Sequence, residues 1–285
     1  LSSALPWMLT QLGIATGAGG RIPQSVHLAF YLGAAVFLGS VLYTIVTTKE
    51  HPPVGPLPDH PGPGRSALSE ILQGVREMPP TMRQLAVVQF FTWLGLFCMW
   101  IYFSPAIAHG IFGGTPGTPA YQRGVEWGGV CFATYNGVAF LAAFALVALA
   151  RRGIATRTLH RVGLICAGVG LLSVGFWRQP GGLLISMAGV GIGWATILSM
   201  PYALLANVLP PARMGFYMGV FNLFIVLPQI LAATLLGPVV QHLLGGRAMP
   251  VVLAGGACML IAAFALSWVG DPVEADRAPP GSAAG

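Results

Sequence analysis

Charge is the scarcest property of this sequence of 285 residues. Charged residues make up 8% of the chain and hydrophobic residues 55%, whereas soluble domains contain roughly 25% charged residues. This contrast excludes a soluble globular protein. The net charge of +6 does not indicate a nucleic-acid partner, because the basic residues are dispersed between apolar runs instead of forming one patch. The lack of charge indicates a chain whose surroundings are a lipid bilayer.

Groups that carry out catalysis or bind metals are also scarce. The chain has eight acidic residues, almost all in loops between apolar runs, and it contains no HExxH, GxSxG or DxxxD pattern. The four cysteines, Cys98, Cys131, Cys166 and Cys258, lie inside apolar runs without CxxC or Cys/His ligand spacing, so we interpret them as packing residues. The sequence therefore predicts that the chain is not an enzyme and has no metal site, disulfide or cofactor.

Long apolar runs take the place of the missing charge. A helix that crosses a bilayer needs about 20 apolar residues. Runs of suitable length lie at about 25–47, 85–106, 128–150, 162–177, 185–205, 214–240 and 251–269, and a shorter helical tail occupies 1–12. The sequence predicts an all-α membrane protein with one incomplete and seven complete transmembrane helices.

The polar stretches between these runs suggest how the chain is organised. The longest, 51–83, begins with prolines too dense for a helix, but its part 66–78 places Leu68, Ile71, Leu72 and Val75 on one helical face. We therefore expect an amphipathic surface helix there. The predicted parts are 1–50 (end of an N-terminal bundle), 51–83 (connector), 84–270 (C-terminal six-helix bundle) and 271–285 (disordered tail).

The basic residues predict the orientation in the membrane. If the connector is cytoplasmic, ten basic residues lie inside and four outside, which agrees with the positive-inside rule. The inner set is Lys49, Arg65, Arg76, Arg83, Arg151, Arg152, Arg157, Arg161, Arg213 and Arg277, and the outer set is Arg21, Arg123, Arg178 and Arg247. We expect a multi-pass protein of the cell membrane with a cytoplasmic C-terminus.

One predicted span carries a polar and aromatic stripe. Gln89, Trp93, Phe97, Trp100 and Ser104 are spaced i, i+4, i+8, i+11 and i+15, which places them on one helical face. Sugars are bound by hydrogen bonds to amides and hydroxyls and by aromatic rings against their apolar faces, so this stripe suits a sugar. The alternative is an aromatic stripe that only packs against other helices.

Other polar residues inside or beside spans have two readings each. Asn136 either faces a wet cavity or bonds a neighbouring helix, because an unsatisfied amide is costly in lipid. Asn222 and Gln229 lie seven residues apart on one face and either bind a ligand or pack. Glu126 stands at the predicted start of a span. It is either a carboxylate stabilised by the helix dipole or a protonatable group that couples proton movement to substrate.

The sequence also resembles a known family. PYALLANVLPPARMGFYMGVFNLFIVLPQI at 201–230, followed by GPVVQHLLGG, is similar to the tenth and eleventh helices of sugar transporters of the major facilitator superfamily. The branch it resembles includes sucrose and maltose proton symporters. YLGAAVFLGSVLYTIVTTKEHPP at 31–53 and QFFTWLGLFCMWIYFSPAIAHGIFGG at 89–114 resemble the sixth and seventh helices of that branch.

This resemblance implies proton-coupled sugar symport by alternating access of two helical bundles. The expected partners are a sugar and protons, together with N-terminal helices of the same polypeptide that would precede Leu1. The expected substrate-binding residues are Gln89, Trp93, Trp100, Asn136, Asn222 and Gln229, with Glu126 as the candidate for proton coupling. The alternatives are a carrier of a non-sugar solute and a membrane-embedded interaction protein that does not transport.

Overall fold

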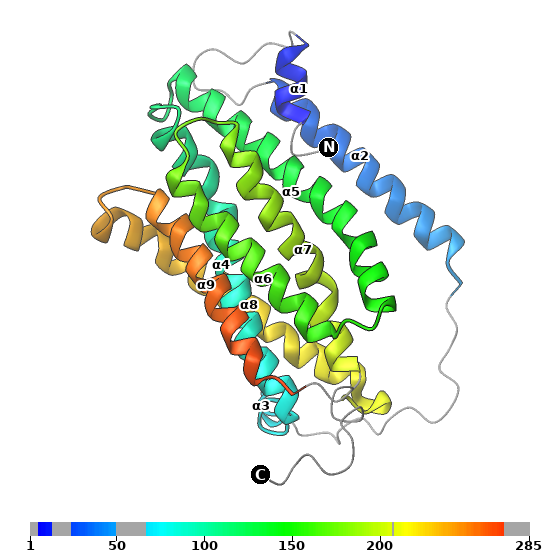
Figure 1. The fold of residues 1–285 in the computed structure, drawn as a ribbon. Helices are drawn as coiled ribbons and strands as arrows, with labels where there is room; N and C mark the ends of the chain where they lie inside the picture. The colour runs from blue at the N-terminus through cyan, green and yellow to red at the C-terminus, as the bar shows by residue number, and fades with distance from the viewer. Residues whose placement is uncertain (1–4, 13–23, 50–66, 207, 271–285) are drawn as a thin grey trace.

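A computed structural model describes residues 5–12, 24–49, 67–206 and 208–270, and these residues form helices and the turns between them (Figure 1). The helices are α1 (Leu5–Gln11), α2 (Gln24–Thr47), α3 (Ala67–Arg76), α4 (Pro80–Gly110), α5 (Pro119–Arg151), α6 (Thr156–Ser173), α7 (Gly182–Ala206), α8 (Met214–Pro238) and α9 (Met249–Ala265). Seven described helices are long and apolar enough to cross a membrane. The prediction of an all-α membrane protein is confirmed.

Two helices are much longer than the apolar runs that predicted them. α4 has 31 residues and α5 has 33, so at 1.5 Å per residue each is about 45–50 Å long and extends beyond a hydrocarbon core of about 30 Å. Both begin with proline, which suits the first helical turn, and the Thr118 hydroxyl accepts a hydrogen bond from the N–H of Tyr121 at the start of α5. The first turns of α5 are polar, so the apolar run from about 128 did not reveal that the helix begins at Pro119.

This early start corrects one interpretation of Glu126. The residue lies seven positions after Pro119, and the first turn of α5 contains no acidic residue. The field of a helix N-terminus falls off within the first turn. Stabilisation of Glu126 by the α5 dipole is therefore ruled out by the true helix boundary.

Helices α4 to α9 form one bundle. α7 packs against α5 and α6, α9 packs against α4 and α6, and α4 also contacts α5 and α8. These contacts make a closed ring in the order α4, α5, α7, α6 and α9, with α8 on the side of α4 (Figure 1). Fully buried side chains such as Phe103, Leu96, Leu164 and Met187 fill the centre of the bundle.

Glycines place α7 close to both of its neighbours. A Cβ atom at Gly191 would lie 2.5 Å from the carbonyl oxygen of Tyr135 in α5, and a Cβ atom at Gly193 would lie 2.5 Å from the Cβ atom of Ala167 in α6. Small residues allow helices in membranes to approach closely. Gly191 and Gly193 of α7 thus face two different neighbouring helices, α5 and α6, and both allow close packing.

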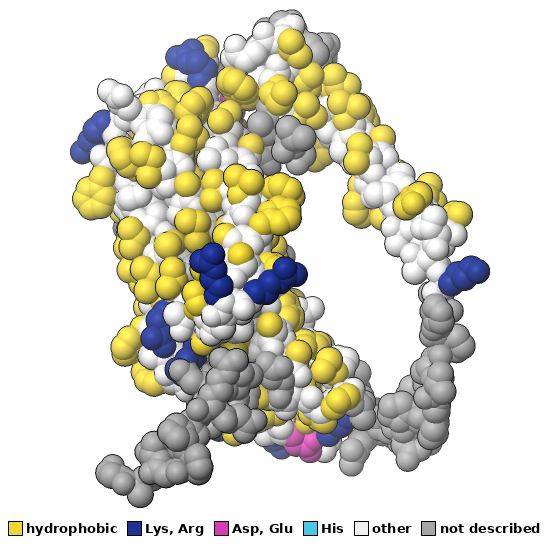
Figure 2. Space-filling view, turned by 45° about the vertical axis from the view of Figure 1, so that its right-hand side comes forward, with side chains coloured by type: hydrophobic (Ala, Val, Ile, Leu, Met, Phe, Trp, Pro, Cys, Tyr) yellow, Lys and Arg dark blue, Asp and Glu magenta, His cyan; other side chains and the backbone are white. Residues whose placement is uncertain are grey.

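Helix α2 stands apart from this bundle. It contacts α1, which in turn contacts α5, and an open space separates α2 from the bundle in the space-filling view (Figure 2). Its large side chains are exposed throughout, including Phe30 at 74% and Val46 at 83%. A helix that is apolar on all sides needs a cover of lipid or of other helices.

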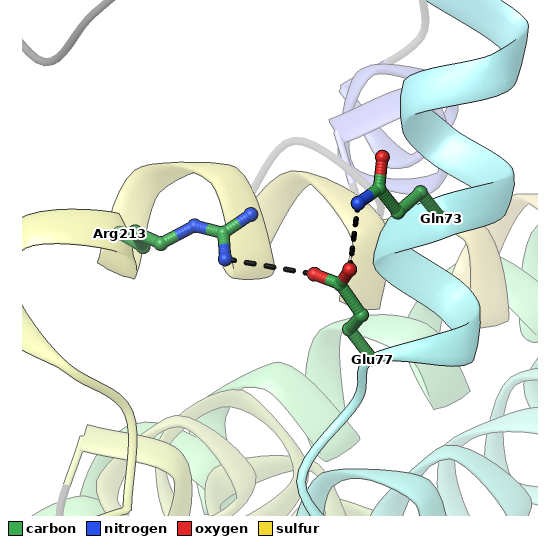
Figure 3. Close-up of polar contacts among 3 residues, drawn as sticks. All are labelled: Gln73, Glu77 and Arg213. Atoms are coloured by element: carbon green, nitrogen blue, oxygen red, sulfur yellow. Dashed lines mark hydrogen bonds and ion pairs between the residues drawn. The ribbon is translucent and has the colours of Figure 1, made fainter.

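The helix α3 packs against the beginning of α8. Gly74 lies directly against the Phe216 ring, while Glu77 accepts a hydrogen bond of 2.6 Å from Gln73 and forms an ion pair of 3.6 Å with Arg213 (Figure 3). The side chains of the ion pair are 51% and 41% exposed, and such pairs stabilise proteins by about 0–1 kcal/mol. The close packing at Gly74 therefore holds α3 more firmly than the ion pair does.

The substitution Gly74→Leu is expected to detach α3 from α8. A Cβ atom at this position would lie 2.6 Å from Cζ of Phe216 and 2.8 Å from Val220, so a leucine side chain has no space there. Limited proteolysis near α3 should become at least about tenfold faster. Lowering the free energy of local opening by about 1.4 kcal/mol raises the population of the opened, cleavable state tenfold. Glu77→Gln is the control and should change the rate by less than about fivefold. Equal effects of the two variants would contradict the packing argument.

Two features predicted from the sequence lie outside the described residues. They are the proline-rich first part of the connector and the C-terminal tail. The division of the chain into bundle, connector and tail stays a prediction.

Candidate substrate-binding site

Aromatic side chains from three helices meet inside the bundle. The centroid of the Trp194 ring in α7 lies 6.1 Å from that of Trp93 and 5.6 Å from that of Trp100, both in α4. The Tyr135 ring in α5 lies 6.3 Å from the Trp194 ring. We call Trp93, Trp100, Trp194 and Tyr135 the aromatic cluster. The steep angles between its rings, 76° to 88° for the contacts of Trp194 with the other members, are the edge-to-face arrangement that aromatic rings prefer.

The aromatic cluster lies at the middle of the helices that form it. Tyr135 is the central residue of α5, which runs from 119 to 151, and Trp194 is the central residue of α7, which runs from 182 to 206. Trp93 is two residues from the centre of α4. Secondary transporters typically bind substrates near the midplane of the bilayer, so the aromatic cluster has the depth expected of such a site.

Buried polar atoms beside the aromatic cluster have no hydrogen-bond partner. The Gln89 side chain is 1% exposed, and neither its nitrogen nor its oxygen has a partner among the described residues. The same holds for Nε1 of Trp93, one helical turn further along α4. A buried polar group without a partner costs about 1–3 kcal/mol. Such a group in a native protein calls for an explanation, of which a bound molecule is one.

A cavity of about 530 Å³ adjoins the aromatic cluster between α5 and α7. Its lining is mostly apolar, with Asn136, Trp194 and Ser199 as the polar contributors. The Asn136 amide donates a hydrogen bond of 2.8 Å to the carbonyl of Phe132 in its own helix, and its oxygen accepts none from the described residues. Pockets of about 300–1,000 Å³ with few polar groups are typical of small-molecule sites. Asn136 thus lines this cavity and forms no hydrogen bond to a neighbouring helix among the described residues, and its role in binding stays a prediction.

The structure does not bring the other predicted residues to the aromatic cluster. Asn222 and Gln229 lie on α8 with exposed side chains, and neither forms a hydrogen bond within the described part of the chain. Glu126 accepts a hydrogen bond of 3.2 Å from Gln122. Glu126 precedes Tyr135 by nine residues, which is about 14 Å along the axis of α5. The binding roles of these three residues stay predictions.

The sequence did not single out two members of the aromatic cluster as binding residues. Trp194 lies in α7 and Tyr135 in α5, and no spacing within the sequence relates them to the stripe on α4. The one local signal is their depth, since each is the central residue of its helix. The side chains gathered here offer aromatic ring faces and hydrogen-bonding groups without charge.

The fold and this site define a multi-pass α-helical membrane protein with a polar aromatic site at mid-depth. Residues 4–233 match the profile of the Major Facilitator Superfamily, and the chain belongs to that superfamily.

The chain is also similar to curated proteins of plants and mammals. It is 24% identical over 269 residues to "Sucrose transport protein SUT5" of Oryza sativa subsp. indica. This alignment covers 85% of this chain and 50% of that protein. It is 25% identical over 231 residues to "Sucrose transport protein SUC3" of Arabidopsis thaliana, covering 72% and 39%. It is 26% identical over 195 residues to "Proton-associated sugar transporter A" of Mus musculus, covering 60% and 25%. The chain spans half or less of the length of these relatives.

Proposed function

We propose that the chain is part of a transporter that moves a sugar across the membrane by proton-coupled symport. The observation that carries this proposal is the buried amide of Gln89 without a partner beside the tryptophans of the aromatic cluster. A sugar presents hydroxyl groups to such an amide and apolar C–H faces to such rings. The names of the relatives, which include sucrose transport proteins and a proton-associated sugar transporter, support the same substrate class.

We also propose that this bundle works together with N-terminal helices of the same polypeptide. Transporters of this fold bind substrate between two bundles that rock against each other. The exposed apolar surface of α2 and its separation from α4 to α9 support assigning it to that second bundle (Figure 1). The 285-residue chain by itself is therefore expected to give no uptake in liposomes.

For proton coupling, Glu126 is our candidate within this chain. Its side chain is half-buried, seven residues after the start of α5. Protonation neutralises the carboxylate and so lowers the free-energy cost of moving it away from water. Gln122 is its one hydrogen-bond partner among the described residues, so a proton on Glu126 would disturb only a local contact. Asn222 and Gln229 would join the site when the second bundle covers the exposed face of α8.

Substitution of Trp93 tests the sugar site directly. In proteoliposomes containing both bundles, uptake of labelled sucrose, maltose and glucose is measured with an imposed pH gradient. Trp93→Ala removes the ring that stacks on the sugar and its Nε1 donor, so uptake should fall on the order of tenfold to 100-fold, since stacking on an aromatic ring contributes about 1–3 kcal/mol. Trp93→Phe should restore part of the loss because it returns a ring face.

The matched control is Trp268→Ala, which removes an exposed tryptophan at the end of α9 with 62% of its surface accessible. This variant should transport normally. Uptake that does not depend on the pH gradient would contradict proton coupling. If a non-sugar solute is taken up and none of the three sugars is, the chain belongs to a carrier of that solute and the sugar proposal is wrong.

A further inference from the structure

A second cavity, of about 600 Å³, lies on a different side of α5 from the candidate site. α5 and α6 each pack extensively against α7 but hardly against each other, so a groove remains between them with α7 as its floor. Leu141, Ala145, Val162 and Ile192 are among its apolar lining residues, and Thr158 and Thr196 contribute its hydroxyls. The Thr196 hydroxyl already donates a hydrogen bond of 2.8 Å to the carbonyl of Gly193. The groove therefore has a hydrocarbon-like interior.

One end of this groove is basic. Ile154 and Thr158 line it where the turn after α5 leads into α6. The exposed Arg151 is the last residue of α5, and the exposed Arg152 lies in that turn. The sequence has no acidic residue between Glu126 and Asp271. Neither arginine forms an ion pair or a hydrogen bond through its side chain within the described residues. Figure 2 shows basic side chains on the lower half of the bundle, the half in which this turn lies.

The first turn of α6 adds a further attraction for negative charge. The residue before it, Ala155, has no side chain that accepts a hydrogen bond from the N–H groups of the first turn. The N-terminus of a helix of 18 residues attracts anions through these N–H groups and through the helix dipole. The arginines and the helix terminus thus place positive potential at the end of an apolar groove.

We propose that this groove binds one anionic phospholipid. The acyl chain lies between α5 and α6 against α7, and the phosphate group lies at Arg151, Arg152 and the N-terminus of α6. The apolar lining selects hydrocarbon, and the two arginines without an acidic neighbour select an anionic head group over a zwitterionic one. Leu146 is the one lining residue that the two cavities share, and the lipid site does not depend on the candidate sugar site.

Native mass spectrometry of the purified 285-residue chain in detergent tests the choice of head group. Phosphatidylglycerol and phosphatidylcholine with the same acyl chains are added at equal concentrations. A basic residue close to an anionic lipid surface contributes about a fivefold change in binding, so Arg151→Gln with Arg152→Gln should weaken phosphatidylglycerol binding about 30-fold. Phosphatidylcholine binding should change little.

The matched control replaces two exposed arginines of other loops, Arg178→Gln with Arg247→Gln. It makes the same change in net charge and should leave the preference for phosphatidylglycerol intact. Equal losses in the two double variants would overturn the proposal, because the effect would then be one of net charge. Retained preference in the Arg151 and Arg152 variant would also overturn it.

A second variant tests the groove. Ala145→Trp places a large side chain among the lining residues and should reduce retention of both lipids at least about tenfold, while Ala257→Trp on the exposed side of α9 should not. Thermal unfolding in lipid-free detergent shows whether each variant is folded. Tight retention of phosphatidylglycerol by folded Ala145→Trp would overturn the placement of the acyl chain.

Discussion

Replacing Gln89 by methionine is expected to stabilise the folded chain and to abolish sugar uptake. Methionine has nearly the shape of glutamine but needs no hydrogen bonds. Because both polar atoms of the buried Gln89 amide are without partners, the substitution removes a desolvation cost of about 1–3 kcal/mol. The same substitution removes the groups that would bind sugar hydroxyls, so uptake should fall on the order of 100-fold.

The control for this prediction is a buried polar residue with its hydrogen bonds made. Ser186 is 1% exposed, and its hydroxyl accepts a hydrogen bond of 2.9 Å from Nε1 of Trp177 and lies 2.6 Å from the hydroxyl of Ser173. Ser186→Ala leaves the indole without an acceptor, so stability should fall by about 1–3 kcal/mol. Because this network lies near the beginning of α7 and away from the aromatic cluster at its centre, uptake by folded protein should persist.

The two variants are thus expected to change stability in opposite directions, and only Gln89→Met is expected to lose uptake. Stability is measured by thermal unfolding of the 285-residue chain in detergent, and uptake in proteoliposomes containing both bundles. A residue that only packs would lose stability and keep uptake when replaced. If Gln89→Met unfolds at a lower temperature and transports normally, the amide has a structural role and the proposed site is wrong.

Substitution of Gly191 is expected to cause a clear loss of stability. Even an alanine Cβ there would lie 2.5 Å from the Tyr135 carbonyl oxygen and 2.8 Å from Cβ of Val138. The backbone oxygen cannot rotate away, so α5 and α7 must move apart. Overpacking of this kind costs about 1–3 kcal/mol for a small group. Gly191→Ala should therefore be clearly destabilised, and Gly191→Leu should fail to form the bundle.

A glycine with free space around it provides the matched control. No atom lies within 4 Å of a Cβ atom built at Gly219 in α8. Alanine favours helix over glycine by about 0.5–1 kcal/mol, so Gly219→Ala should be neutral or slightly stabilising. Thermal unfolding of both variants measures the difference, and equal stabilities would contradict the close contact between α5 and α7.

Gly191→Ala has a second expected effect, on the aromatic cluster. Tyr135 approaches Trp194 to 6.3 Å across the contact that Gly191 permits. If α5 moves outward, the Tyr135 ring separates from Trp194 and water gains access to the indole. The tryptophan fluorescence of folded Gly191→Ala should shift to longer wavelength, whereas that of Gly219→Ala should not.

Helix content and the membrane setting were predictable from the sequence alone. The apolar runs and the lack of charge dictate spanning helices, because lipid offers no partner for unpaired backbone groups. The stripe of Gln89, Trp93 and Trp100 was also predictable, since the period of a helix relates residues of one element. The ends of the helices were less predictable, because hydropathy marks the segment inside the hydrocarbon core and not the polar turns by which α4 and α5 extend beyond it.

Only the tertiary structure decided which residues share a site with that stripe. The Trp194 ring in α7 lies 6.1 Å from the Trp93 ring in α4, and contacts between residues a hundred positions apart leave no period in the sequence. The groove between α5 and α6 was likewise set by packing. The sequence by itself determined the helices and the chemistry along each of them. Their mutual contacts, which depend on the shapes of facing surfaces, determined the sites.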